Sequence, residues 1–299
     1  MNSKLLPADN GINLFVEYSD PGFPNADTIF FLHGYPDTHK TWEKQIDFFK
    51  NHFKIINADI RGAGQSSPPR DRKGYQSKEL INDVNKIINE FVSRDSKVHL
   101  VGHDWGAVIF WSYLSNPENQ RRIHSFSAVA CPHPSLFFKN TFGKMFSFNP
   151  KKIGEGWKQF AKSYYILLFQ LPFVPEFLWE NFTEDIWEFV MTNSGLSESD
   201  KMNFLTKEEV VSFTKNNINL YREALQSGFE SLPPAPLNIP VSLFIPEDDT
   251  LISPEVYDES ESIVSKLRTF RIQANHWIHR ERPEWFNQKL YQFLIYTSK

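Results

Sequence analysis

Short apolar runs alternate with helix-period segments along most of this chain, and this alternation limits the possible folds more than any other feature. Seven runs rich in β-branched and aromatic residues predict strands, at residues 12–19, 28–33, 54–59, 97–102, 126–130, 241–246 and 267–272. Several are apolar throughout, as expected for a parallel sheet that helices cover on both faces. Helical patterns lie between them, at residues 39–51, 77–92, 106–117 and 282–296. The sequence therefore predicts an α/β fold with a mostly parallel central sheet flanked by helices.

The alternation is interrupted between residues 133 and 236. This segment has no convincing strand pattern, carries Phe, Trp and Tyr at helical spacing, and ends in the proline cluster "SLPPAPLNIP" at 231–240, which predicts a stiff linker. An insertion between two strands lies at the carboxyl edge of the sheet, where ligand sites of α/β proteins form. We therefore predict a helical cap at 133–236, inserted into a core formed by 1–132 and 237–299. The simpler interpretation is that these helices extend the core and the aromatic residues are packing.

The stretch "VGHDWGAVIF" at 101–110 places an aspartate, Asp104, at a tight turn between a predicted strand and a predicted helix. A nucleophile elbow needs small neighbours because the turn is strained and crowded, and Gly102, Gly106 and Ala107 supply them. Two simpler interpretations compete. Asp104 could be an ordinary helix N-cap, or it could be a solvated turn residue.

The stretch "FLHGYPD" at 31–37 predicts a bent loop after a strand. In the α/β-hydrolase layout, one backbone N–H from this loop and one from the residue after the nucleophile form an oxyanion hole. Here Tyr35 and Trp105 would supply these groups. An ordinary turn after a strand would contain the same Gly and Pro.

Two further polar positions follow the last two strands. Asp249, in "VSLFIPEDDTLI", and His276, in "QANHWIHRERPEW", come after Asp104 in the order nucleophile, acid, histidine that this fold uses. His276 is preferred to His279 because it directly follows a strand. Asp249 is preferred to Asp248 and Glu247 on register.

These stretches together resemble the α/β-hydrolase superfamily, in its epoxide hydrolase branch. "HGYPD", "DIRGAGQSSPP", "GHDWGA", "ACPHPSLF", "EDD" and "NHW" occur in the order of that family. The resemblance covers nearly the whole chain and implies that Asp104 is the nucleophile. It also implies substrate contacts from His33, Pro36 and Trp105. The chain departs from the family at Phe173, where a glycine is common.

The resemblance further implies two acids in the cap. The family's tyrosines match Tyr165, in "YILLFQLP", and Tyr221, in "INLYREAL". A carboxylate can displace a leaving group at an sp³ carbon, forming an alkyl ester of the enzyme. Water, activated by a His276–Asp249 pair, would then attack the carbonyl carbon of Asp104. An epoxide needs a proton on its leaving oxygen, and tyrosines stay protonated at neutral pH.

The expected activity is therefore epoxide hydrolysis, a hydrolase reaction on an ether bond that gives a vicinal diol from an apolar epoxide. A haloalkane dehalogenase would share Asp104, Asp249 and His276 but needs only N–H donors for its halide, which an indole of the cap could supply (Trp157, Trp179 or Trp187). A ligand-binding receptor on the hydrolase fold is a third interpretation, and its sign would be tight binding without turnover.

Composition limits the partners. The net charge is −4 without a basic stripe, so we expect no nucleic-acid partner. The one cysteine, Cys131, excludes an intramolecular disulfide and favours a reducing compartment, so we expect a cytoplasmic protein. The start "MNSKLLPADN" lacks the apolar core of a signal peptide, and no apolar run approaches about 20 residues. We also expect no membrane contact, no metal and no cofactor, because neither a ligand cluster nor a phosphate loop is evident.

Overall fold

An eight-stranded sheet forms the centre of the molecule in this computed structural model, which describes residues 1–23, 25–197, 200, 205–226 and 237–298. The strands are β1 (Asn2–Pro7), β2 (Asn13–Ser19), β3 (Thr28–Leu32), β4 (Lys54–Ala58), β5 (Val98–His103), β6 (Ile123–Val129), β7 (Leu237–Pro246) and β8 (Val264–Ile272). They are ordered β1-β2-β4-β3-β5-β6-β7-β8. The pairs β1–β2 and β2–β4 are antiparallel, and all later pairs are parallel. The predicted mostly parallel sheet is confirmed.

Each of the seven predicted strands is present, but two features differ. The first strand, β1, was not predicted, because it is an edge strand that buries only Leu6 and so has no clear apolar pattern. The strand β7 begins at Leu237, four residues before the predicted start at 241. The last part of the proposed proline linker therefore belongs to the sheet, and its remainder, up to residue 236, lies outside the described residues.

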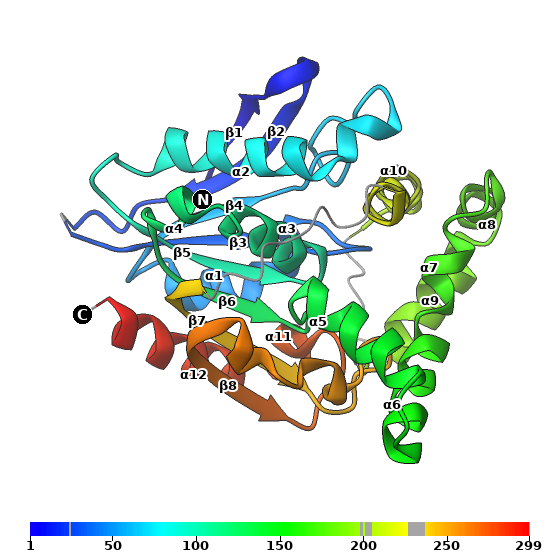
Figure 1. The fold of residues 1–299 in the computed structure, drawn as a ribbon. Helices are drawn as coiled ribbons and strands as arrows, with labels where there is room; N and C mark the ends of the chain where they lie inside the picture. The colour runs from blue at the N-terminus through cyan, green and yellow to red at the C-terminus, as the bar shows by residue number, and fades with distance from the viewer. Residues whose placement is uncertain (24, 198–199, 201–204, 227–236, 299) are drawn as a thin grey trace.

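Helices cover both faces of the sheet (Figure 1). One face carries α1 (Glu43–Phe49), α11 (Ile278–Glu281) and α12 (Pro283–Thr297), and the other carries α2 (Ser77–Phe91) and α3 (Trp105–Leu114). Along β3, Phe30 and Leu32 pack toward the α2–α3 side while Phe31 packs in the second core with Phe286 of α12. This alternation explains why β3 is apolar throughout, since a strand with helices on both sides buries every side chain.

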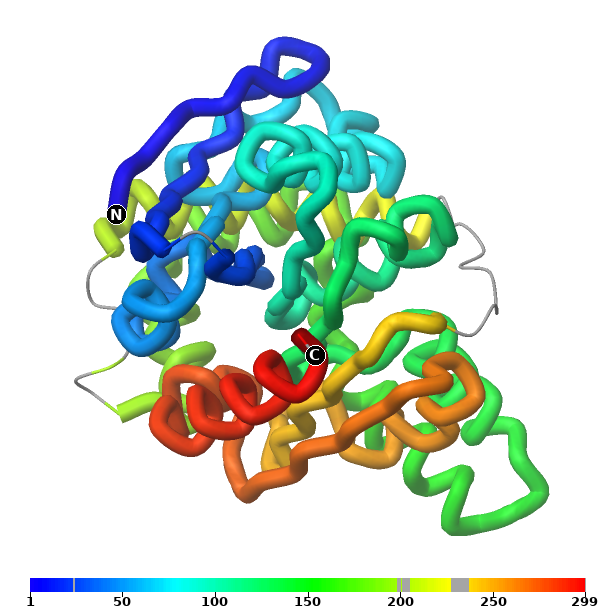
Figure 2. The backbone as a smooth tube through the Cα atoms, turned by 90° about the vertical axis from the view of Figure 1, so that its left-hand side faces the viewer, coloured from blue at the N-terminus to red at the C-terminus, as the bar shows by residue number. Residues whose placement is uncertain are grey.

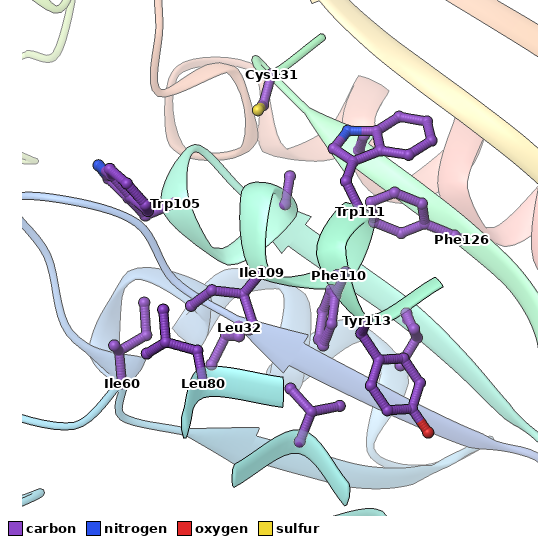
Figure 3. Packing of buried hydrophobic residues seen from close by; sticks show 14 of the residues in the cluster. Leu32, Ile60, Leu80, Trp105, Ile109, Phe110, Trp111, Tyr113, Phe126 and Cys131 are labelled. Carbon is purple, nitrogen blue, oxygen red and sulfur yellow. The ribbon is translucent and has the colours of Figure 1, made fainter. Parts of the chain in front are cut away.

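The helix α3 is packed into the core by side chains on all sides. Figure 3 shows Ile109 next to Leu32 and Leu80, while Trp111 lies against Phe126 of β6. The Trp111 and Phe126 rings meet edge to face with centroids 4.8 Å apart. Because α3 begins directly after β5, this packing fixes the turn that joins the two elements.

The described residues between β6 and β7 form helices and no strand. These are α5 (Pro134–Phe138), a π-helical turn (Lys139–Gly143), α6 (Pro150–Lys162), α7 (Tyr164–Leu168), α8 (Val174–Asn181), α9 (Thr183–Asn193) and α10 (Lys207–Gln226). They lie beside one edge of the sheet, at the right of Figure 1. Phe173, at the position where related sequences often have glycine, adopts a left-handed conformation with φ +65°.

The remaining short elements that the structure describes are α4 (Pro117–Gln120) and 3₁₀ turns at Asp9–Gly11, His39–Trp42, Arg72–Tyr75, Pro254–Tyr257 and Ser260–Ser262. The C-terminal end lies at the left-hand side of the molecule in Figure 1 and therefore faces the viewer in Figure 2. Among the described helices, none combines the length and the apolar character that crossing a bilayer requires.

Candidate active site

Asp104 lies at the carboxyl end of the central strand β5, at the turn into α3. Its backbone has φ +47° and ψ −119°, a conformation that costs a non-glycine residue about 1–3 kcal/mol. A Cβ on Gly102 would lie 2.6 Å from the backbone nitrogen of Ala107, and one on Gly106 would lie 2.2 Å from the carbonyl oxygen of Leu32. The expected crowding of this turn, which only small residues permit, is confirmed.

The simpler interpretations of Asp104 are wrong. It occupies the N-cap position of α3, but its side chain accepts no capping hydrogen bond from the helix. The carboxylate instead accepts a hydrogen bond through Oδ1 from the backbone N–H of Tyr35, at 2.8 Å. Its side chain is only 13% exposed, so it is not a solvated turn residue either.

The loop after β3 is packed against this carboxylate. A Cβ on Gly34 would lie 2.5 Å from the Cβ of Asp104, so only glycine allows the loop to come this close. The close approach brings the N–H of Tyr35 to Asp104, as expected, and Trp105 follows at the first position of α3. Sequence reasoning missed the need for glycine at 34, although the "HG" pair was a visible signal.

His33, an expected substrate contact, lies elsewhere. Its ring is fully buried, and its Nε2 accepts a hydrogen bond from the N–H of Ile60 at 3.0 Å. It lines neither cavity described below, so its part in substrate binding stays a prediction. Pro36 lines the larger cavity and Trp105 the smaller one.

His276 follows β8 and lies between two carboxylates. Its Nδ1 is 2.8 Å from Oδ2 of Asp249, and its Nε2 is 3.7 Å from Oδ2 of Asp104. The other oxygen of Asp249 accepts hydrogen bonds from the N–H groups of Leu251 (2.7 Å) and Ile252 (3.0 Å), which fix the orientation of this buried carboxylate. The fold therefore brings together the three residues expected from chain order.

The alternative residues do not reach this place. Asp248 is exposed, and its N–H donates to the carbonyl oxygen of Ala274. His279 lies behind His276, where its Nε2 contacts the hydroxyl of Thr41 at 2.8 Å. The choice of Asp249 over Asp248, and of His276 over His279, therefore agrees with the geometry.

The positive charge of His276 and the negative charge of Asp104 stabilise each other. Burial alone lowers the pKa of His276, but the charge of Asp249 and the interactions with Asp104 outweigh it and raise this pKa to about 10. Burial alone raises the pKa of Asp104, but the interactions with His276 outweigh it and lower this pKa below the usual value. At neutral pH the imidazolium of His276 therefore lies beside the ionised carboxylate of Asp104.

Three buried polar side chains gather directly behind His276, although no spacing in the sequence indicates a ligand cluster. Polar atoms of Asp37, His103 and His279 lie within 4.8 Å of one another. The indole of Trp277 donates to Asp37 at 3.0 Å, and Nε2 of His103 donates to the carbonyl oxygen of His276 at 3.1 Å. We assign no metal to this cluster, because both oxygens of Asp37 already accept hydrogen bonds, one from the N–H of Thr38 and one from the indole of Trp277. Its contacts hold the loop that carries His276.

Tyr165 of α7 and Tyr221 of α10 lie across from Asp104. Their ring centroids are 5.8 Å apart, and the Tyr221 ring is 5.0 Å from that of Trp105. Burial, followed by nearby charges, raises the pKa of both hydroxyls above the usual value for tyrosine. Both hydroxyls are therefore protonated at neutral pH and can donate hydrogen bonds.

Two apolar cavities meet at this tyrosine pair. The larger, of about 670 Å³, lies under α7, α8 and α9 and is lined by Tyr35, Pro36 and Trp179 among others. The smaller, of about 140 Å³, is lined by Asp104, Trp105 and Cys131 together with α5 and α7. Tyr165 and Tyr221 line both. The smaller cavity contains the carboxylate, and the larger one has the volume of a small-molecule site.

The family follows from a comparison with known proteins. A family model described as "alpha/beta hydrolase fold" matches residues 27–283, which is most of the chain. The chain belongs to the α/β-hydrolase family. This confirms the fold class expected from the sequence, and the matched range includes Asp104, Asp249 and His276.

Relatives at modest identity point to one branch of the α/β-hydrolases. "Epoxide hydrolase 4" of Homo sapiens is 26% identical over 96% of this chain and 76% of its own length. "Probable oxidoreductase EphD" of Mycobacterium tuberculosis is 25% identical over 94% of this chain, which spans about half (48%) of that relative. A solved structure of a mutant epoxide hydrolase from Bacillus megaterium, with its diol product, is 25% identical with a TM-score of 0.76 and covers 97% of this chain and 99% of that one. The resemblance to the epoxide hydrolase branch is thus confirmed.

Proposed function

We propose that this α/β-hydrolase is an epoxide hydrolase that adds water to an apolar epoxide and releases a vicinal diol. The observation that carries the proposal is the placement of two protonated tyrosine hydroxyls opposite a carboxylate that is paired with a histidine. A carboxylate can open a strained ring, and the hydroxyls can protonate the oxygen that leaves. Residues 133–236 act as the cap that brings these hydroxyls over the core, formed by 1–132 and 237–299.

In the first step, an oxygen of Asp104 attacks a ring carbon of the epoxide. The ring C–O bond breaks, and the leaving oxygen takes a proton from Tyr165 or Tyr221. The product is an alkyl ester of Asp104. The low pKa of Asp104 keeps its carboxylate ionised for the attack, and apolar walls keep bulk water out.

The ester changes the charge around His276. Esterification removes the negative charge of Asp104, which is one of the interactions that raise the pKa of His276. The pKa of the imidazole then falls and its Nε2 proton passes to the tyrosinate left by the first step, which restores the tyrosine, so that His276 can act as a base. Asp249 continues to hold Nδ1–H of the ring.

In the second step, neutral His276 takes a proton from water, and the hydroxide adds to the carbonyl carbon of Asp104. The N–H groups of Tyr35 and Trp105 stabilise the resulting oxyanion. The intermediate collapses, the ester C–O bond breaks, and the alkoxide takes the proton from His276. The new carboxyl group of Asp104 passes its proton to His276, which restores the imidazolium and the ionised carboxylate, and the diol leaves.

The alternatives have less support. A haloalkane dehalogenase would share the triad, but it has no use for two tyrosine hydroxyls. Of the indoles considered as halide donors, Trp179 lines the larger cavity and Trp157 is 53% exposed. A non-catalytic receptor would not need the Asp104–His276–Asp249 arrangement. Turnover of a panel of epoxides and bromoalkanes decides among the three. Diol from epoxides supports the proposal, while halide release alone or binding without turnover would contradict it.

A further inference from the structure

Exposed aromatic side chains gather at one corner of the helical segment. We call the corner formed by Phe142, Phe146, Phe148 and Trp157 the aromatic corner. Phe146 is 82% exposed, Phe148 is 106% exposed and Trp157 is 53% exposed. Single exposed apolar residues are ordinary, but a group of this size marks an interaction surface.

Ring contacts connect part of the aromatic corner. The ring centroid of Phe160 lies 6.1 Å from that of Phe142 and 5.7 Å from that of Trp157, so the Phe160 side chain connects the other two. Phe146 and Phe148 lie in the connection that leads into α6. The helix α6 extends away from the sheet at the lower right of Figure 1, so the corner projects from the body of the molecule.

The charge of this corner is opposite to that of the whole chain. Residues 139–162 contain six lysines and one acid, Glu155, whereas the chain has a net charge of −4. Lys139 and Lys158 pair with acids of the facing loop, Glu259 and Glu255.

Buried Lys144 pairs with Glu155 and Asp258. Lys151 and Lys152, at the exposed start of α6, have no ion pair within the part of the chain that the structure describes. Lys151 and Lys152 therefore add exposed positive charge close to Phe148 in the chain, and Glu259 offsets part of that of Lys152.

A second exposed apolar region, at α8 and α9, has the opposite character. Phe173 and Phe177 of the α8 region are 83% and 57% exposed, but the helices there carry acids, among them Glu180, Glu184 and Glu188. An anionic surface would attract the aromatic corner and repel the α8–α9 region.

The corner also adjoins the smaller cavity. Phe142 is 41% exposed and at the same time lines the cavity that contains Asp104. Phe138 and Phe160, which neighbour it, line the same cavity. Phe138, Phe142 and Phe160 therefore lie between the corner and the cavity that contains the carboxylate.

We propose that the aromatic corner docks on the surface of an anionic lipid bilayer. Phe146, Phe148 and Trp157 enter the interface, and Lys151 and Lys152 lie at the level of the lipid phosphates. Docking opens a route by which an epoxide dissolved in the bilayer reaches Asp104, and this second part rests on the proposed function. The proposal departs from our sequence-based expectation of no membrane contact, since exposure cannot be read from the sequence.

A second copy of the chain fits this surface less well. In a two-fold symmetric contact the same patch lies on both sides, so the unpaired lysines of one copy would face those of the other. Like charges at such short range oppose association. An anionic membrane would attract these lysines, so docking on it involves no such repulsion.

The experiment measures binding of the purified protein to vesicles by flotation. Vesicles of phosphatidylcholine alone are compared with vesicles that also contain phosphatidylglycerol. The tested variants are Phe146→Ser with Phe148→Ser, and Lys151→Gln with Lys152→Gln. The control is Phe173→Ser with Phe177→Ser, which removes similarly exposed rings from the acidic region. None of these residues lines either cavity.

We expect the wild type to bind the anionic vesicles. The phenylalanine pair should lose roughly tenfold or more in partition coefficient. The lysine pair should lose about fivefold for each lysine, and only on anionic vesicles. The control should bind like the wild type. Absence of wild-type binding to anionic vesicles, or an equal loss in the control, would overturn the proposal. So would a dimer in light scattering that the phenylalanine pair dissociates while vesicle binding is unchanged.

Turnover separates this proposal from the proposed function. A water-soluble epoxide such as styrene oxide should be hydrolysed equally by the wild type and all variants. A long-chain epoxide dissolved in anionic vesicles should be hydrolysed more slowly by the two tested variants. If the protein binds vesicles as expected but hydrolyses no epoxide, the docking proposal is supported and the proposed function is wrong. If both variants hydrolyse the vesicle-bound epoxide at the wild-type rate, the delivery role is wrong.

Discussion

Removing the two hydroxyls opposite Asp104 should slow ring opening without damaging the fold. We consider Tyr165→Phe and Tyr221→Phe, singly and together. A proton donor contributes 10²–10⁴-fold in a transition state, which corresponds to about 3–5 kcal/mol. Because the rings lie 5.8 Å apart and both line the cavity of Asp104, either hydroxyl can assist when the other is absent. Each single variant should therefore lose less than this, and the double variant should lose the full amount.

The stability should change little, since phenylalanine keeps the ring and only a hydrogen bond worth about 1 kcal/mol is lost per site. The assay is the single-turnover rate of Asp104 alkylation, followed by mass spectrometry, with an epoxide and with a bromoalkane. Bromide leaves without a proton, so alkylation by a bromoalkane should be almost unaffected. Tyr113→Phe, which removes a hydroxyl from α3 outside both cavities, serves as the control. An epoxide rate in the double variant within a few-fold of the wild type would refute the acid role of these tyrosines.

Three further changes test other parts of the site. His276→Gln should stop the second step, so that intact-mass spectrometry finds Asp104 carrying the substrate; diol formation at the wild-type rate would contradict the role of His276. Asp104→Asn imitates the neutral ester and should lower the pKa of His276 from about 10 toward its usual range, because one of the carboxylates that hold the proton is gone; an unchanged NMR titration would show that the ester cannot switch His276 to a base. Gly34→Ala should abolish most turnover and cost about 1–3 kcal/mol in denaturant unfolding, because its Cβ would meet Asp104 at 2.5 Å. The matched change Gly143→Ala should reduce neither turnover nor stability, because no atom lies within 4 Å of the added Cβ.

The parts of the fold that could be predicted are those whose side-chain burial leaves a pattern within the segment itself. A strand such as β3 buries both faces, so its apolar run is visible in the sequence. The edge strand β1 buries one side chain and leaves no such signal. The start of β7 was misplaced because Pro240 lies within the strand, and prolines near a strand predict a turn.

The residues of the site also fall into two groups, those that could be predicted from the sequence and those that could not. The elbow at Asp104 could be predicted because its small neighbours are adjacent in sequence, and Asp249 and His276 because strand ends meet at one edge of a parallel sheet. The bond between Asp37 and the indole of Trp277 could not, because it joins segments 240 residues apart without any spacing rule. The burial of His33 away from the cavities has the same cause, since the direction of a side chain depends on packing from several elements.

The central claim is that Asp104 forms a covalent ester with the substrate and that water then attacks the carboxyl carbon of Asp104. A single turnover in oxygen-18 water, with enzyme in excess over epoxide, tests it most directly. The account predicts that the diol of this first turnover contains no oxygen-18, because its new oxygen comes from Asp104. The label should appear in the peptide that contains Asp104. A labelled diol together with an unlabelled Asp104 would mean that water attacks the epoxide directly, and it would contradict the account.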